Sequence, residues 1–529
     1  MAIVRIHEVG NTGINSDLIP QYLPHGVWSE GQNVRMQDSS VRKFLGHIEQ
    51  MGAAQVAPYF LLPVVQGANI YWLYAGENKA YCIDGTSHSE ITKSSSDYTA
   101  TTFTQWNGGI LNGVPIINNG VDDPQQWTDP APTNLLADLS NWPANTKAAV
   151  IRPFKSFLVA LYITKSGTEY PYLIKWSHPA DPGTVPSTWD ETDVTKLAGE
   201  AVLSQTPGHL VDCLPLRDVN ILYKEDSTWA MSYVGGNLVF RFYKIMDTVN
   251  ALTQNCVTEF FGQHLVLTTD DVVLHDGQSP RSLLNRRMKK FLFSRLSSDN
   301  FYYSHVAHNP RDREIWICFP ETGESFCTLA LVWNYQEDSI GVRDLPGTVH
   351  TAPGVVNPGT GTDTWDSDTD SWNSDTAAWG EETFSDVKKE LVTASPASGS
   401  EAIFTFDTTQ QFDGSDLRAY VERSGIPIAG VDAKGEPVVD AESRKLLKEV
   451  WPRAEVFGGG AKIDVYVGSQ DAEDQPISWT GPFEFYPESD RKVNCLISGR
   501  LLAVRFQTED STPWALHGYD LNIQKIGSY

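Results

Sequence analysis

The stretch from residue 313 to residue 346 most constrains the fold, because it alternates short apolar runs with tight turns. Residues 315–319 read IWICF, an apolar run rich in β-branched and aromatic side chains. The next residues, PETGES, are turn formers, and Gly323 can adopt a positive φ. Two further apolar runs, 327–335 and 339–345, are separated by an acidic turn. Three short antiparallel strands cannot bury both faces alone, so this unit is expected to stack on similar units, as one blade of a β-propeller does.

Alternate side chains of the first of these runs point to opposite faces of the expected strand. Ile315, Ile317 and Phe319 share one face, and Trp316 and Cys318 share the other. Both sets are apolar. We therefore expect this strand to be buried on both sides, between neighbouring blades and away from the rim.

Similar units recur between about residues 56 and 350. The other instances lie around residues 70–85, 110–120, 157–176, 220–233 and 265–277. Several of them contain the Asn-Gly or Asp-Gly dipeptides that are typical of hairpin turns. The pattern predicts an irregular β-propeller of about six blades, with six to eight possible, over residues 56–350. A pair of packed sandwiches is the alternative.

The segments on either side of this region differ from it. Residues 1–55 are expected to form an extended N-terminal clasp, with a hairpin around a polar turn at residues 37–40. Residues 386–529 are expected to form a C-terminal β-sandwich-like domain with a short helix at 443–450. Its strands are predicted at residues 402–406, 417–421, 462–467, 483–486, 492–497, 501–506 and 518–523.

Residues 351–385 change in composition and are dominated by Asp, Ser, Thr, Gly and Pro. Trp365, Trp372 and Trp379 recur every seventh residue, but the low helix propensity around them excludes a coiled coil. The run Asp-x-Asp-x-Asp from residue 366 resembles the start of an EF-hand loop but lacks its glycine and glutamate, which argues against calcium. We expect a linker whose Trp rings dock on a neighbouring domain.

The overall charge narrows the possible partners. The chain has 529 residues, too many for one core, with 66 acidic and 40 basic residues and a formal net charge of −26. Such a surface repels nucleic acid phosphates and does not bind them by counterion release.

The N-terminus has no apolar leader and no run approaches about 18 apolar residues, so neither a secretory signal nor a membrane span is expected.

Six cysteines occur without a CxxC spacing, at positions 82, 213, 256, 318, 327 and 495. Neither a zinc site nor a redox motif is therefore expected. Cys318 and Cys327 would face each other across a hairpin that turned on residues 322–323. Two free core thiols in a reducing cytosol are the favoured interpretation.

One segment runs against the acidic trend. Residues 282–296 place apolar side chains at helical spacing and predict a helix. The other positions carry the densest set of cations in the chain: Arg286, Arg287, Lys289, Lys290 and Arg295. This helix is a candidate contact with DNA or with an acidic neighbouring subunit. The alternative is a solvated helix packed between blades, since a run of charged residues usually marks a solvent-exposed helix face.

The sequence shows no catalytic motif: no G-x-S-x-G, H-E-x-x-H, P-loop or dinucleotide-binding fingerprint. His305 and His308 are three residues apart on an expected strand or turn, so their side chains are not expected to converge on a metal. Adjacent carboxylates fall in predicted turns. We expect neither an enzyme nor a cofactor or metal site.

Several motifs, taken in their order along the chain, resemble the nozzle proteins of short-tailed bacteriophages, also called tail tubular protein B or tail stabilisation protein. They are WSEGQNVR with KFLG, KWSHP with a later WD, REIWICFP, the Asp/Trp linker, FDG with ERSG, and SGRLLAVRF. The early motif ends in MQDS at residues 36–39, where the family has a Phe-x-Asp-Gly type of turn, and so departs from the family pattern.

The resemblance implies a propeller-based subunit of the virion tail, assembled in the host cytoplasm into a homo-hexamer below the adaptor ring. It implies tail fibre or tail tip proteins as further partners, genomic DNA passing through the lumen, and no catalytic residues. Six copies would carry six times the charge of −26, and a lumen lined with part of it would let DNA slide. The alternative function is a carbohydrate-binding or carbohydrate-cleaving β-propeller at a phage tail tip or cell surface.

Overall fold

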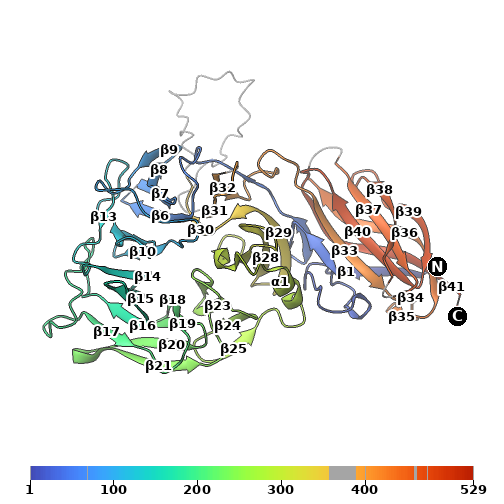
Figure 1. The fold of residues 1–529 in the computed structure, drawn as a ribbon. Coiled ribbons are helices and arrows are strands. Elements are labelled where there is room, and N and C mark those ends of the chain that lie inside the picture. The colour runs from blue at the N-terminus through green and yellow to red at the C-terminus, as the bar shows by residue number, and fades with distance from the viewer. Residues whose placement is uncertain are drawn as a thin grey trace, which may run out of the picture.

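The computed structural model describes residues 2–67, 69–356, 389–399, 401–457, 461–472 and 475–527. The predictions for Trp365, Trp372 and Trp379 and for the linker from residue 357 onward lie outside these residues, whereas residues 351–354, also expected in the linker, form part of a strand. The regular secondary structure of the described chain is almost entirely β, with a ring of small sheets beside a two-layered C-terminal unit (Figure 1). The expectation of a mainly β protein with a propeller and a sandwich-like domain is confirmed.

Five four-stranded sheets follow one another along the chain, each an antiparallel meander. Blades one and two contain β6 (Phe60–Gln66), β7 (Asn69–Ala75), β8 (Ala80–Asp84), β9 (Ser87–Glu90), β10 (Asn107–Leu111), β11 (Val114–Asn118), β12 (Gln125–Gln126) and β13 (Ala137–Asp138). Blade three contains β14 (Thr146–Phe154), β15 (Phe157–Lys165), β16 (Thr168–Trp176) and β17 (Gly199–Val202). Blades four and five contain β18 (Leu210–Leu216), β19 (Val219–Lys224), β20 (Thr228–Gly235), β21 (Val239–Met246), β22 (Val257–Phe260), β23 (Gln263–Leu267), β24 (Val272–His275) and β25 (Pro280–Ser282).

Two more sheets complete the ring. Blade six contains β26 (His305–Asn309), β27 (Glu314–Phe319), β28 (Cys327–Asn334) and β29 (Ser339–Thr348), and blade seven β30 (His350–Gly354), β31 (Glu390–Ser395), β32 (Ala402–Phe406) and β5 (His47–Ile48). The first strand of each blade contacts the first strand of the next, and β30 returns to β6. The described residues thus form a closed ring of seven blades, one more than the six units counted in the sequence.

Blade seven differs from the expected domain limits. Its strands come from residues before 356, after 389 and from the N-terminal segment, so the propeller extends across the boundaries expected at 350 and 386. The polar, Trp-containing stretch falls between the first and second strands of this blade. The change of composition at residues 351–385 was therefore interpreted as a domain boundary, although it lies between two strands of one blade.

The N-terminal segment belongs to both domains. β1 (Ala2–His7) pairs with β41 (Trp514–Gly527), and β2 (Glu30–Gln32) pairs with β33 (Ala419–Ile426), each in a sheet of the C-terminal unit. β3 (Val34–Gln37) and β4 (Ser40–Lys43) form the predicted hairpin. This hairpin joins blade six to β41, which makes one ten-stranded sheet that runs through both domains.

The C-terminal unit is a sandwich of two sheets that share one core. One layer contains β41, β36 (Arg444–Val456), β39 (Val493–Gly499) and β1, and the other contains β33, β40 (Leu501–Thr508), β37 (Ile463–Gln470), β38 (Ser478–Phe485) and β2, with a small ribbon of β34 (Ile428–Val431) and β35 (Pro437–Val439). The helix expected at 443–450 is wrong. That segment is the start of β36, which has paired strands on both sides, and this pairing overrides the helix propensity of Leu, Lys and Glu.

β27 behaves as its alternation predicts. Ile315, Ile317 and Phe319 pack into a core shared with blade five and the sandwich, whereas Trp316 and Cys318 pack toward blades one and seven. All five side chains are fully buried.

The hairpin that follows β27 has a different register from the one that would bring its two cysteines together. Phe319 pairs with Leu329, which places Cys318 opposite Ala330 and not opposite Cys327. All six cysteines are buried and free. No helix among the described residues is long and apolar enough to span a bilayer.

Candidate functional site

The cationic segment is only partly helical. α1 (Lys289–Arg295) is seven residues long, and the expected start at Ser282 lies in β25. Between them the chain turns, and Arg286 adopts a φ of +58°, outside the helical region. The predicted helix over 282–296 is therefore too long, because the blade-five strand and the turn after it take its first half.

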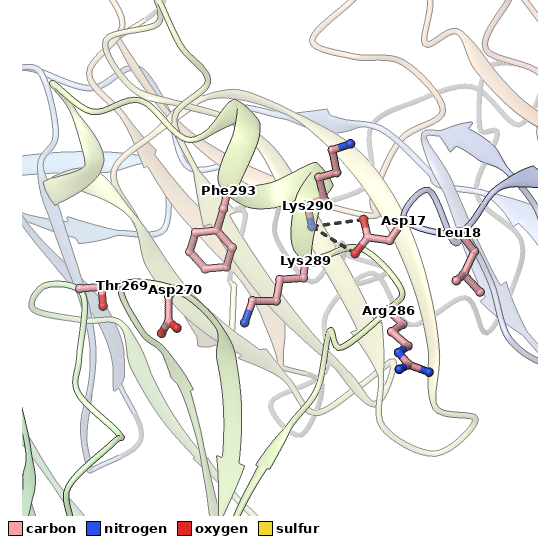
Figure 2. Close-up of a pocket in the computed structure, with 8 residues that line it drawn as sticks. All are labelled: Asp17, Leu18, Thr269, Asp270, Arg286, Lys289, Lys290 and Phe293. Atoms are coloured by element: carbon pink, nitrogen blue, oxygen red, sulfur yellow. Dashed lines mark hydrogen bonds between the residues drawn. The ribbon is translucent and has the colours of Figure 1, made fainter. Parts of the chain in front are cut away.

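The N-terminal segment holds this turn in place. The Asn15 side-chain amide donates to the Arg286 carbonyl at 3.0 Å, and the backbone N–H groups of Ser16 and Asp17 both donate to the Arg287 carbonyl at 3.1 Å. The Asp17 carboxylate accepts the backbone N–H of Lys290 at 3.1 Å and 3.2 Å, shown by the dashed lines in Figure 2. The backbone that carries the cations is thus held by hydrogen bonds from the N-terminal segment, which the sequence alone did not reveal.

Three of the five cations are paired within the chain. Arg287 lies 3.0 Å from Asp338, Lys289 lies 3.3 Å from Asp271, and Arg295 lies 3.3 Å from Glu321. These carboxylates come from turns of blades five and six. The cationic segment is accordingly anchored between two blades, as in the packed-helix interpretation, and much of its charge is already matched.

A hollow of about 540 Å³ lies beside α1. It is lined by Asp17, Leu18, Thr269, Asp270, Arg286, Lys289, Lys290 and Phe293. Figure 2 shows the three cationic side chains pointing in different directions from the turn and from α1. With two carboxylates among three diverging cations, this hollow lacks the converging positive charge that would mark a phosphate site.

A second candidate, the axis of the propeller, is filled by polar side chains. Gln105 donates to the Tyr302 carbonyl and lies 3.1 Å from the Thr253 hydroxyl, and Asn107 donates to Gln254 at 3.1 Å. Gln105 and Asn107 lie at the entry to blade two. Their partners lie in the segments that precede blades five and six. Since these blades are not neighbours, the bonds cross the axis.

Arg152 of blade three completes this plug. Its guanidinium lies 2.8 Å from Asp212 of blade four and donates to the Asn255 side chain at 2.7 Å and to the Gly108 carbonyl at 3.1 Å. Burial lowers the pKa of this guanidinium, but Asp212 more than offsets the effect and raises it, so Arg152 stays charged. A cavity left among Gln105, Gln254, Asn255 and Tyr302 has a volume of about 20 Å³, room for about one water molecule. The axis is therefore closed to any polymer.

The two histidines considered as metal ligands have separate surroundings. His305 is buried, with Nδ1 3.1 Å from the Tyr303 carbonyl and Nε2 3.0 Å from the Thr351 hydroxyl. His308 lies near Tyr335, at 3.4 Å from its hydroxyl. Within the part of the chain that the structure describes, no group of three or more His, Cys, Asp or Glu side chains is placed to hold a metal.

Comparison with known proteins gives structural neighbours only. No protein-family model matches the chain, and no curated protein matches it. A structure of PorZ, described as an essential surface component of the type-IX secretion system of Porphyromonas gingivalis, is 10% identical with a TM-score of 0.32 and covers 72% of this chain. This chain spans 43% of that PorZ chain.

Two isolated domains are similar at the same level. The CNH domain of AfRom2 has a TM-score of 0.36, and the WD40 β-propeller domain of Doa1 has a TM-score of 0.33. Each is 8% identical, covers 69% of this chain and is itself covered to 97%. With TM-scores this low, these similarities carry no argument about what this chain does.

Proposed function

We propose that this chain is the repeating subunit of the tail nozzle of a short-tailed bacteriophage, a structural virion protein whose six copies form a ring below the adaptor ring. The ordered sequence motifs suggest the family, and one structural observation carries the proposal further. The ten-stranded sheet passes from blade six through β3 and β4 into the sandwich, so backbone hydrogen bonds join the two domains. The wall of a conduit needs subunits whose two domains stay attached. The N-terminal segment, which pairs with the sandwich through β1 and β2 and with blade seven through β5, provides that attachment.

The plugged propeller axis supports a conduit between copies and not within one. Arg152 and the hydrogen bonds that cross the axis leave no passage inside the blades. The genome would then pass through the centre of the ring, and the propellers would form part of its wall. The adaptor ring protein and tail fibre or tail tip proteins would be the other partners in the virion tail.

The charge of the chain suits a conduit for DNA. The formal net charge is −26, and Arg287, Lys289 and Arg295 are already paired with carboxylates of the same chain. A wall with this excess of negative charge repels phosphate groups, so duplex DNA would slide along it without sequence-specific binding.

The mass of the assembled protein tests the proposal. Native mass spectrometry and electron microscopy of the purified protein, alone and mixed with its adaptor protein, should show a ring of six copies with an open centre. A monomer or trimer that binds glycans would contradict the proposal and support a carbohydrate-binding propeller instead. An image of single subunits in which each propeller axis is open would contradict the assignment of the lumen to the ring centre.

A further inference from the structure

Five largely buried charged side chains meet where the N-terminal hairpin joins blades six and seven. They are Arg35 of β3, Asp312 in the turn before β27, Glu314 at the start of β27, Arg343 of β29 and Asp407 after β32. The side chains of Glu314 and Arg343 are each 2% exposed, and Asp312, the most accessible, is 16% exposed. This joint cluster lies where, in the described part of the chain, the propeller and the sandwich share a sheet.

The two arginines connect the three carboxylates. Arg35 lies 3.1 Å from Glu314, 2.6 Å from Asp407 and 3.6 Å from Asp312. Arg343 lies 2.8 Å from the other oxygen of Asp407. Arg343 also donates to the Leu45 carbonyl at 2.8 Å, so the cluster reaches the chain between β4 and β5.

The charges in this cluster do not balance. Three carboxylates face two guanidiniums, and arginine does not lose its proton in proteins. On the elements packed around the cluster, the other nearby titratable groups are His47 of β5 and Cys318 of β27, both fully buried. Burial raises the pKa of the Cys318 thiol, which is therefore neutral. Burial, helped by Arg343, lowers the pKa of His47 to about 3, so this ring is neutral. One unmatched negative charge would be left in the interior, where it is costly, unless one carboxyl holds a proton.

Glu314 is the carboxyl best placed to hold it. Asp407 lies between both guanidiniums, which lower its pKa despite burial. Burial raises the pKa of Glu314 to about 7, against the opposing effect of Arg35. Its Oε2 already accepts hydrogen bonds from Arg35 and from the Trp316 indole N–H, at 3.2 Å and 3.1 Å. Its Oε1 lies 3.1 Å from Arg35 Nε in an ion pair without a hydrogen bond, so Oε1 is the oxygen left to carry the proton.

The backbone attachment at this joint is slight. β3 and β29 share a single paired position, Val34 opposite Val342. We propose that the joint cluster is a proton-linked joint: Glu314 holds one proton while the joint is closed, and release of that proton to solvent as the pH rises weakens the attachment of β3 to blades six and seven. This inference does not depend on the assembly of copies into a ring.

Hydrogen exchange measured by mass spectrometry tests the joint. Peptides that cover residues 33–46 and 403–409 are compared at about pH 6 and about pH 8.5, after correction for the intrinsic pH dependence of exchange. The pKa of Glu314 is near 4.5 in an unfolded chain and about 7 in the folded chain. Stability therefore falls as the pH rises from about 4.5 to about 7, and it is level above that pH. Opening of the joint should therefore be about tenfold more frequent at the higher pH, the factor that one pKa unit supplies.

Two variants separate the proton from the packing. Glu314→Gln keeps the size and the neutral state of the protonated carboxyl but cannot release a proton. Hydrogen exchange at the joint should therefore be the same at both pH values in this variant. Asp312→Asn, at the more accessible carboxyl, leaves two carboxylates to balance two guanidiniums and should also abolish the pH dependence. Glu321→Gln, in a turn of the same blade, is the matched control and should behave as wild type.

Each outcome decides the proposal. Exchange in wild type that is equal at both pH values would overturn it, and so would a pH dependence that survives in Glu314→Gln. If Glu314→Gln does not fold, Asp312→Asn decides, because an unchanged pH dependence in that variant would overturn the charge count.

Discussion

The Tyr223 hydroxyl donates its hydrogen to Nδ1 of His264 at 2.7 Å, across the seam between blades four and five. The direction is fixed because Nε2 of His264 faces the Pro215 carbonyl at 2.9 Å and must carry the proton there. Nε2–H of His275 in turn donates to the Tyr223 oxygen at 2.7 Å, while its Nδ1 accepts the Gly277 N–H. This buried chain of hydrogen bonds joins the two blades and is fully satisfied.

Replacing Tyr223 with Phe should therefore destabilise the propeller by about 1–3 kcal/mol for each group left unpaired, here Nδ1 of His264 and Nε2–H of His275. Urea unfolding followed by fluorescence measures the change. Tyr170→Phe is the matched control, because Tyr170 is 43% exposed and should lose little. An unfolding midpoint for Tyr223→Phe equal to that of the control would show that the hydroxyl contributes nothing to the seam.

The same two histidines should make the propeller sensitive to acid. Burial lowers the pKa of His264 and of His275 to about 4, whereas in an unfolded chain it is about 6.5. Below pH 6.5 these two histidines bind protons in the unfolded chain but stay neutral in the folded chain. Stability should therefore fall as the pH drops from about 6.5 to about 4 and then level off.

His264→Gln should reduce this slope, and His7→Gln, at an exposed position, should leave it unchanged. Denaturant unfolding of each variant is compared with wild type at the same pH, since Glu314 changes stability in the opposite direction over part of this range. Equal slopes in wild type and His264→Gln would contradict the assignment.

Replacing Trp316 with Ala should cost about 3–5 kcal/mol, the usual range for a large buried aromatic side chain. Trp316 is fully buried, its ring lies 5.0 Å from Phe406, and Arg343 lies over its face at 4.7 Å. Thermal melts of the unassembled protein measure the loss. Phe261→Ala removes an aromatic ring that is 80% exposed and should leave the melting temperature nearly unchanged. A melt of Trp316→Ala that matched wild type would mean that blade six is not packed as described.

The purified protein should show no measurable binding to duplex DNA at about 0.15 M salt, because its net charge is −26 and three of its clustered cations are paired. Fluorescence anisotropy with a labelled duplex, over a series of salt concentrations, measures this. The double variant Arg286→Gln, Lys290→Gln should behave as wild type. Tight binding with a steep salt dependence that this variant lost would instead make the cationic segment a DNA site.

The sequence by itself determined the features that depend on neighbouring residues. The alternation in residues 315–319 predicted two buried faces, and β27 has them. The polar turn at residues 37–40 predicted the hairpin of β3 and β4. Strands β33, β37, β38, β39, β40 and β41 of the sandwich overlap strands expected from the sequence, because alternation and turn residues are local signals. The strand expected at residues 402–406 also forms, but as β32 of blade seven.

Other features depend on partners far away in the chain, and only the tertiary structure decided them. β36 is a strand because β39 and β41 pair with both of its edges, and α1 is short because β25 takes the residues before it. Blade seven draws its strands from three distant segments. The cationic segment was visible in the sequence, but the carboxylates that neutralise it were not. Pairing between distant strands and matching of distant charges leave no periodic pattern in the sequence, so they are fixed only when the ring closes.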